Sequence, residues 1–184
     1  CIYERNDEAL RDKEGLPQHK GFAPLPGEAM PAGTVTQITE NGVKYTVDFE
    51  NGQKTGFFLD QKYNRRAVAR LAAGKRVLDS FALNAALGGA EHVTAVDVSP
   101  SAVDMARQNA ILNGLEGRMD FLCADVFDLL PRLLEEKRRE WDFIILDPPA
   151  FTKSRRTADQ AARGYKEINY RAMKLLPRGG YLAT

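Results

Sequence analysis

From residue 59 to its end, the chain alternates short apolar segments with helix-like ones. The strand-like segments are 76–79, 92–97, 119–123, 141–147 and 180–184, and the helix-like segments are 61–73, 82–87, 100–113, 126–137 and 157–176. Asp60 and Ser99 are the predicted N-caps of the first and third helix-like segments. Strands that alternate with helices are typical of βαβ units, which build a parallel sheet covered by helices on both faces. The sequence therefore predicts an α/β domain with a Rossmann-like sheet.

Residues 1–58 follow a different pattern. Segment 15–33 contains four prolines and is expected to be a loop, whereas 35–40, 43–50 and 53–58 are strand candidates. Asn41-Gly42 and Asn51-Gly52 separate these candidates, and Asn-Gly favours tight hairpin turns. With an extended segment at 2–4 and a short helix at 7–14, we predict a small α+β domain with a β-meander over 1–58. A second domain would cover 59–184 and stop after its fifth strand.

The composition excludes several classes of protein. The chain has 184 residues, 43% of them hydrophobic, and two cysteines. This is too apolar for a disordered chain and too poor in cysteine for a disulfide scaffold. Without an apolar run of about 18 residues, a membrane helix is not expected. We therefore expect a cytoplasmic protein with no membrane partner.

Charge is balanced overall but not locally. The net charge is +1, yet residues 151–180 contain eight Lys or Arg against Asp159 and Glu167. This excess is typical of a surface that contacts nucleic-acid phosphates, although an ordinary solvated helix is also consistent with it.

Four aspartates follow successive predicted strands: Asp79, Asp97, Asp125 and Asp147. Ligands of open α/β sheets bind outside the carboxyl ends of the strands. A single aspartate there is usually a helix cap or a turn residue, but four suggest a shared site. We expect Asp97 to accept the hydroxyls of a ribose, Asp125 to accept an adenine amino group, and Asp79 to lie near the amino-acid end of a cofactor.

Asp147 is followed by two prolines, which fix φ and remove two N–H donors. This predicts a rigid turn that holds the Asp147 carboxylate toward the pocket.

These segments resemble a known series of motifs. The runs 77–79, 96–99, 124–126 and 146–149 are similar to the motifs of class I S-adenosylmethionine-dependent methyltransferases. Residues 56–66, which include Phe57-Phe58-Leu59-Asp60-Gln61, and residues 106–114 resemble the bacterial 23S rRNA cytosine-C5 methyltransferases. In that family an RNA-binding PUA domain and a small middle domain precede the catalytic domain. The resemblance implies that the PUA domain and the C-terminal part are absent from this chain.

The resemblance also implies roles for individual residues. S-adenosylmethionine would be bound by Gln61, Arg65, Arg66, Asp79, Ser80, Asp97, Val98, Asp125 and Val126. Asp147 would orient the target base, with Pro148, Pro149 and Phe151 binding the RNA substrate and no metal involved. Arg65 and Arg66 could instead lie on a solvated helix face, and Phe151 could instead cap the core.

The sequence departs from the family at two places. The family has a glycine-containing loop after its first strand, whereas here Ser80 is followed directly by Phe81 and a helix-like segment. We expect that several residues belonging to this loop are missing between Ser80 and Phe81. The family's nucleophilic cysteine would lie beyond Thr184, because Cys1 is terminal and we expect Cys123 to be a buried structural thiol.

Three other functions remain open. Methylation of a guanine nitrogen in rRNA needs no cysteine. A nicotinamide-dependent oxidoreductase would also place an aspartate after the second strand, but no Gly-x-Gly-x-x-Gly follows the first strand. A non-catalytic RNA-binding scaffold would keep the fold alone. The sequence leaves the oligomeric state open, a homodimer included.

Overall fold

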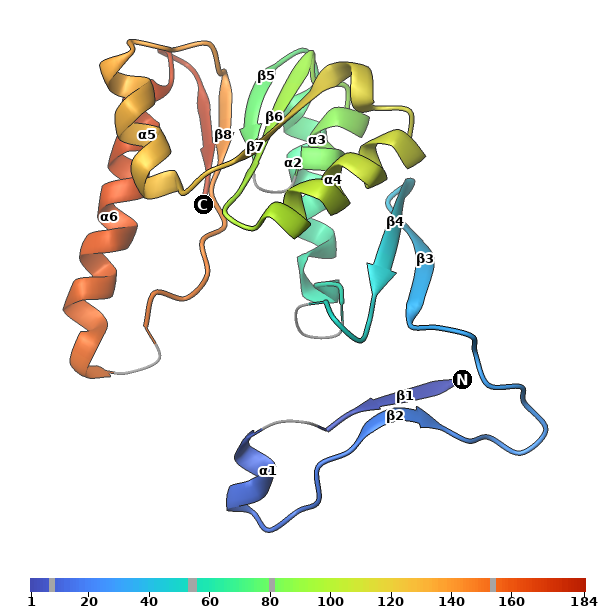
Figure 1. The fold of residues 1–184 in the computed structure, drawn as a ribbon. Helices are drawn as coiled ribbons and strands as arrows, with labels where there is room; N and C mark the ends of the chain where they lie inside the picture. The colour runs from blue at the N-terminus through green and yellow to red at the C-terminus, as the bar shows by residue number, and fades with distance from the viewer. Residues whose placement is uncertain (7–8, 53–55, 80–81, 153–154) are drawn as a thin grey trace. The chain divides into compact units, whose positions relative to one another are not determined.

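The structure, a computed structural model, describes residues 1–6, 9–52, 56–79, 82–152 and 155–184 (Figure 1). They form two compact units. The smaller unit comprises Cys1–Ile38 and Thr46–Asp60, and the larger comprises Thr39–Tyr45 and Gln61–Thr184. The division between domains at residues 58 and 59 stays a prediction.

The smaller unit contains a strand pair, of which the sequence predicted the first strand and not the second. Strand β1 (Ile2–Arg5) pairs antiparallel with β2 (Lys20–Ala23), and helix α1 (Ala9–Lys13) lies between them in sequence. The prediction of a continuous loop over 15–33 was therefore wrong. Strand β2 is short and flanked by prolines, and it forms because it pairs with residues about eighteen positions earlier in the chain.

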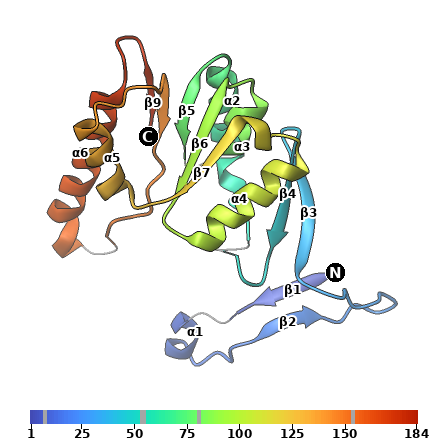
Figure 2. The ribbon, with the colours of Figure 1, turned by 45° about the horizontal axis from the view of Figure 1, so that its top comes forward.

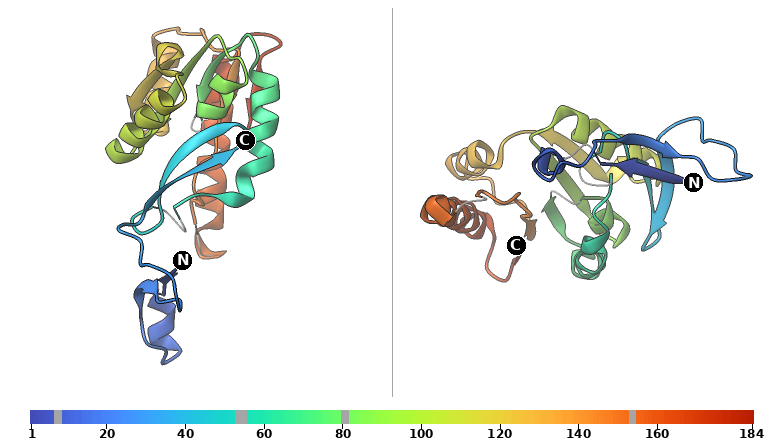
Figure 3. Two further views of the ribbon diagram at one scale, coloured as in Figure 1. Left: turned by 90° about the vertical axis from the view of Figure 1, so that its right-hand side faces the viewer. Right: turned by 90° about the horizontal axis from the view of Figure 1, so that it is seen from below.

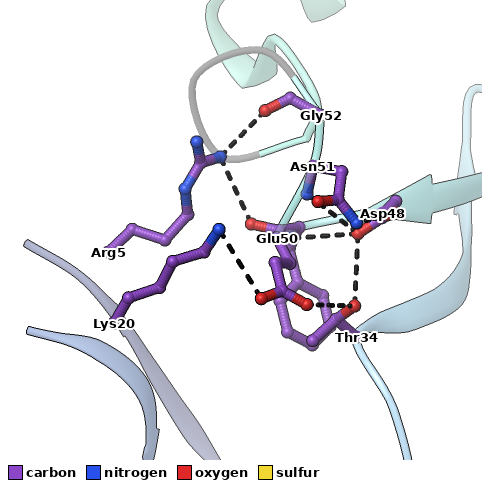
Figure 4. Close-up of polar contacts among 8 residues, drawn as sticks. Arg5, Lys20, Thr34, Asp48, Glu50, Asn51 and Gly52 are labelled. Carbon is purple, nitrogen blue, oxygen red and sulfur yellow. Dashed lines mark hydrogen bonds and ion pairs between the residues drawn. The ribbon is translucent and has the colours of Figure 1, made fainter. Parts of the chain in front are cut away.

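Polar contacts fasten the β1–β2 pair to the segment after Asp48 within this unit (Figure 4). The Arg5 guanidinium donates to the carbonyl oxygens of Phe49 and Gly52 at 3.3 and 2.8 Å, and Lys20 pairs with Glu50 at 3.5 Å. The rings of Tyr3, Phe22 and Phe49 meet edge to face, with centroids 4.9 to 6.1 Å apart. Aromatic edge-to-face contacts and charge-assisted hydrogen bonds together stabilise this small unit.

Asp48 closes the turn that follows. Its carboxylate accepts hydrogen bonds from the Asn51 side chain, the Asn51 and Glu50 backbone and the Thr34 hydroxyl. The Asn51 side chain contributes most to lowering the pKa of Asp48, because these bonds favour the ionised carboxylate.

A hairpin is formed by β3 (Val35–Glu40) and β4 (Val43–Asp48). Its Asn41-Gly42 turn is confirmed, with φ of 52° and 84° at the two residues, as a tight hairpin turn requires. The third strand of the predicted meander is not confirmed. Residues 53–55 lie outside the described part, and residues 56–58 are not in a strand.

The larger unit is built on a five-stranded parallel sheet, as predicted (Figure 2). Its strand order is β7-β6-β5-β8-β9. The strands are β5 (Arg76–Asp79), β6 (His92–Asp97), β7 (Met119–Cys123), β8 (Phe143–Ile145) and β9 (Tyr181–Ala183). The α/β Rossmann-like class is thus confirmed.

Helices cover both faces of this sheet (Figures 1 and 3). They are α2 (Lys62–Ala72), α3 (Ala82–Leu87) and α4 (Pro100–Leu112) on one face, and α5 (Val126–Glu135) and α6 (Ala158–Leu175) on the other. Short 3-10 turns occur at Leu59–Gln61, Glu116–Arg118 and Arg155–Thr157.

Alternate residues of the strands point to opposite faces, and both are buried. Leu78, Val96 and Ile144 pack with residues of α5 and α6 such as Leu130 and Ile168, all at most 7% exposed. Burial on both faces explains why Val77 and Leu78 of β5 and all three residues of β8 are apolar.

The starts of the helices agree only partly with the sequence analysis. Ser99 caps α4 as predicted, since its hydroxyl accepts from the Ala102 N–H at 3.4 Å. Asp60 was expected to cap α2, but the helix is preceded by the 3-10 turn Leu59–Gln61, and the residue at the cap position is Gln61. The 3-10 turn displaces Asp60 from the position where its carboxylate would cap.

Candidate active site

A crevice of about 290 Å³ opens in the larger unit at the carboxyl ends of β5, β6, β7 and β8. All four strand-end aspartates, Asp79, Asp97, Asp125 and Asp147, line it. The expected convergence of these carboxylates on a single crevice is confirmed. It follows from the sheet order, which places the four parent strands side by side.

Asp97 and Asp125 are held by the loops that carry them. One Asp97 oxygen accepts the N–H of Ser99 at 2.8 Å, and one Asp125 oxygen accepts the N–H of Phe127, also at 2.8 Å, capping α5. Both aspartates are exposed. The capping bonds fix the direction of each carboxylate at the rim of the crevice, so capping and ligand binding are compatible roles here.

The interior of the crevice is apolar. Its lining includes Leu78, Val96, Leu129, Leu130, Ile145, Leu146 and Ile168. Val98, which is 68% exposed, and Val126 also line it. An apolar slot edged by carboxylates suits a flat aromatic base that carries a hydroxylated sugar.

Asp79 differs from the other three because it is buried, with 1% of its surface exposed. A buried polar pair lies within electrostatic reach of Asp79: Asn84 donates to the Tyr45 hydroxyl at 2.5 Å. Burial raises the pKa of Tyr45 to about 12, with the nearby Glu40 and Asp79 carboxylates adding to the effect and Asn84 and Arg65 opposing it. Asp79 is thus a buried carboxylate of the crevice lining that lies near enough to the Tyr45 hydroxyl to influence its pKa.

Three of the predicted cofactor residues do not line this crevice. Arg65 is 5% exposed and forms a two-point ion pair with Glu40, at 2.6 and 3.0 Å. The Gln61 side chain accepts from the Asn64 amide at 2.7 Å, and Arg66 is exposed on α2. Their cofactor role stays a prediction. Ser80, with Phe81 and the loop expected between them, lies outside the described residues.

The substrate side of the crevice is formed by Pro148, Pro149 and Phe151, which line it together with Asp147. The Phe151 ring lies 5.4 Å from that of Phe127 and 4.4 Å from that of Tyr165. Neither ring contact of Phe151 was predicted from the sequence. Phe127 could have been found from its place directly after Asp125-Val126, whereas Tyr165 lies far along the chain and gave no local signal.

Cys123 is exposed, so the expectation of a buried thiol was wrong. It ends β7, which is an edge strand of the sheet, and edge residues lack a neighbour on one side. Its Sγ donates to the Val98 carbonyl at 3.5 Å, next to the crevice.

Candidate metal sites and membrane-spanning helices are both absent from the described ranges. Within them, no three His, Cys, Asp or Glu side chains gather in a way that could hold a metal ion. No helix in those ranges has the length and apolar character needed to cross a membrane.

Comparison with known proteins gives consistent results. The family model for S-adenosylmethionine-dependent methyltransferases matches residues 23–184. The ribosomal RNA large subunit methyltransferase I of Aeromonas salmonicida is 48% identical over 190 residues, covering 100% of this chain and 47% of that protein. The protein of the same name from Photobacterium profundum is 46% identical over 190 residues, again covering 100% of this chain and 47% of the relative. The chain thus spans about half the length of the curated relatives it matches.

Solved structures show the same fold. SMU.776, described as a methyltransferase and solved with SAH, has a TM-score of 0.71 and 29% identity, with 87% of this chain and 43% of that chain covered. A methyltransferase from Agrobacterium tumefaciens has a TM-score of 0.70 at 24% identity, with 88% of this chain and 55% of that one covered, which shows the fold alone. On its sequence, its sheet and its crevice, the chain belongs to the S-adenosylmethionine-dependent methyltransferase family.

Proposed function

We propose that the protein methylates ribosomal RNA, using S-adenosylmethionine, and that its target is C5 of a cytosine in 23S rRNA. The observation that supports this most directly is the set of four carboxylates around one apolar crevice. The relatives that match the whole chain are named ribosomal RNA large subunit methyltransferases. An rRNA substrate in bacteria would place the protein in the cytoplasm.

The crevice fits the parts of S-adenosylmethionine, which would supply the methyl group. Asp97 would accept the ribose hydroxyls, and Asp125 would accept the adenine amino group while Val126 packs on the ring. The buried Asp79 would face the positively charged methionine end. Gln61, Arg65 and Arg66 lie outside the crevice lining. If they bind the cofactor, we expect them to contact its methionine end.

The target base would meet the opposite wall. Asp147 would accept a hydrogen bond from the base, and the rigid prolines would hold it there. Cytosine C5 becomes nucleophilic only after a thiolate has added to C6, so the reaction needs a cysteine. We place that cysteine beyond Thr184, as the family resemblance implies.

The basic residues after Phe151 would contact RNA phosphates. Arg163, Lys166 and Lys174 are exposed on α6, while Arg171 pairs with Glu167 on the same helix. Such contacts position the RNA without reading its sequence and weaken with salt.

We also infer that a glycine-containing loop belongs after Ser80. The match to the Aeromonas salmonicida protein runs over 190 positions, six more than the 184 residues of this chain, so that relative carries residues with no counterpart here. A chain with a glycine-containing loop inserted between Ser80 and Phe81 should bind S-adenosylhomocysteine more tightly than the chain as it stands. Equal affinities would contradict this inference.

Two measurements test the proposed function. Calorimetry should show binding of S-adenosylhomocysteine and none of NADH, and the reverse would favour an oxidoreductase. The full-length protein should then transfer labelled methyl groups to 23S rRNA, and nucleoside analysis should find 5-methylcytosine. Methylguanine instead would support the nitrogen-methylating alternative, and no transfer despite cofactor binding would support an RNA-binding scaffold.

A further inference from the structure

The loop that follows β8 is hydrogen-bonded to Tyr165 of α6. The Tyr165 hydroxyl accepts the N–H of Phe151 at 3.3 Å and donates to the carbonyl oxygen of Pro149 at 3.4 Å. The N–H of Leu146 donates to Ala183 at 2.9 Å, which fixes the start of the same loop to β9. Asp147 therefore lies between two anchored points.

The tyrosine ring also holds a ring of the loop. The centroids of Tyr165 and Phe151 are 4.4 Å apart, and their planes are inclined by 34°. Beside Tyr165, Gly164 leaves room for this contact, since a Cβ there would lie 3.2 Å from Phe151 Cδ2. Only a glycine lets the Phe151 ring lie this close to the helix without displacement.

The Phe151 side chain lines two cavities. It lines the crevice, and with Phe127 it also lines a second cavity of about 420 Å³ against Ala161 and Gly164 of α6. Because both cavities share these two rings, a shift of the Phe151 ring would change the lining of both.

We propose that Tyr165 is a positioning residue, whose hydroxyl and ring hold the 147–151 loop in the conformation that shapes the crevice and aims Asp147 into it. The expected effect of Tyr165 on methyl transfer rests on the proposed function. The two hydrogen bonds and the ring contact support it without reference to the reaction.

The test separates the hydroxyl of Tyr165 from its ring. Tyr165→Phe removes both hydrogen bonds and keeps the ring, and Tyr170→Phe is the matched control, since Tyr170 lies on the same helix and is 48% exposed. Losing one hydrogen bond of about 1 kcal/mol corresponds to roughly a fivefold change in the equilibrium constant for opening of the loop. We expect amide hydrogen exchange at Phe151 to accelerate at least about fivefold in Tyr165→Phe, with exchange in the sheet unchanged.

Ligand binding supplies the second measurement. Tyr165→Phe should lower the affinity for S-adenosylhomocysteine severalfold, without changing the melting temperature by more than the Tyr170→Phe control does. Gly164→Ala, which displaces the Phe151 ring while leaving the Tyr165 hydroxyl, should lower affinity in the same direction. In the full-length protein, kcat/KM for RNA should fall severalfold in Tyr165→Phe and stay unchanged in Tyr170→Phe.

The outcomes are distinguishable. Unchanged exchange at Phe151 in Tyr165→Phe would overturn the inference, whatever the protein binds. Faster exchange with unchanged affinity would also overturn it, because the loop would then not shape the crevice. If the unaltered chain binds no S-adenosylhomocysteine, the proposed function fails, and the exchange rate at Phe151 alone decides whether Tyr165 holds the loop.

Discussion

The guanidinium of Arg65 meets the carboxylate of Glu40 at two points, Nε to Oε1 at 2.6 Å and Nη2 to Oε2 at 3.0 Å, with both side chains buried. The pair ties helix α2 to the tip of the β3–β4 hairpin within the larger unit. Because both charges are buried, each needs the other to offset the free-energy cost of leaving water, and the two hydrogen bonds fix their geometry.

Removing one partner of this pair should be costly. Arg65→Met leaves the Glu40 carboxylate buried without its cation, and we expect the free energy of unfolding to fall by about 3 kcal/mol or more. The double variant Glu40→Leu with Arg65→Met should lose less. Urea denaturation measures both, with Arg70→Met, an exposed arginine of the same helix, as control. A double variant less stable than the single one would contradict this reading.

Tyr45 should make the protein sensitive to alkali. Its pKa in the folded protein is about 12, above the ordinary value of 10.0, so the folded state keeps a proton that the unfolded chain releases above pH 10. Its contribution to stability is therefore complete below pH 10 and is lost as the pH rises toward 12. At pH 11 the loss should be roughly 1 kcal/mol. Comparing denaturation of the unaltered protein and Tyr45→Phe at pH 8.5 and 11 should show a smaller decline in the variant.

Asp97 and Asp125 should decide cofactor affinity. Asp97→Asn replaces an ionised acceptor, and we expect S-adenosylhomocysteine to bind at least about tenfold more weakly, as for a hydrogen bond to a charged group. Asp125→Asn keeps an oxygen that can cap α5, so any loss of affinity there should come without loss of stability. Asp128→Asn, on the exposed first turn of the same helix, is the control for calorimetry. Unchanged dissociation constants in both variants would remove the carboxylates from the proposed site.

Gly88 should not tolerate a side chain. A Cβ at this position would lie 2.2 Å from the carbonyl oxygen of Ala69 and 2.7 Å from its Cα, where α2 and α3 pack together. Backbone cannot move aside as a flexible side chain can, and we expect Gly88→Ala to destabilise the protein by about 1–3 kcal/mol. Gly117→Ala is the control, because nothing lies within 4 Å of a Cβ there. Similar melting temperatures for the two variants would show that the helices can separate without cost.

Cys123 should react in the folded state. In a Cys1→Ser variant, we expect Ellman's reagent to modify one thiol per chain without denaturant, since Cys123 is exposed. A thiol that reacts only after unfolding in urea would mean that the edge of the sheet is covered in solution.

An element could be predicted from the sequence where neighbouring residues specify it, and not where it depends on residues far away in the chain. The strands ending at Asp79 and Asp97 were found because apolar runs and helix signals are local. The tight turn at Asn41-Gly42 was found for the same reason. Strand β2 was missed because its partner is distant in sequence, and Cys123 was misjudged because the sequence does not tell which strand lies at an edge.

The candidate site followed the same rule. The four aspartates could be assigned to one crevice because parallel strands all end at the same side of a sheet. The contacts of Tyr165 with Phe151 could not be anticipated, since they join segments that only the packing of α6 brings together. Arg65 was assigned to the cofactor by resemblance, and its pairing with Glu40 depends on a hairpin whose place against α2 no local pattern encodes.

The order of the strands gives the crevice a modular character. Across the sheet its carboxylates come in the sequence Asp125, Asp97, Asp79 and Asp147, each at the tip of a separate strand. A substitution at the end of one strand alters a single point of contact with the bound molecule, while the buried strands hold the other three carboxylates in place. Ligand preference in a scaffold of this kind can therefore change by substitutions at one strand end at a time.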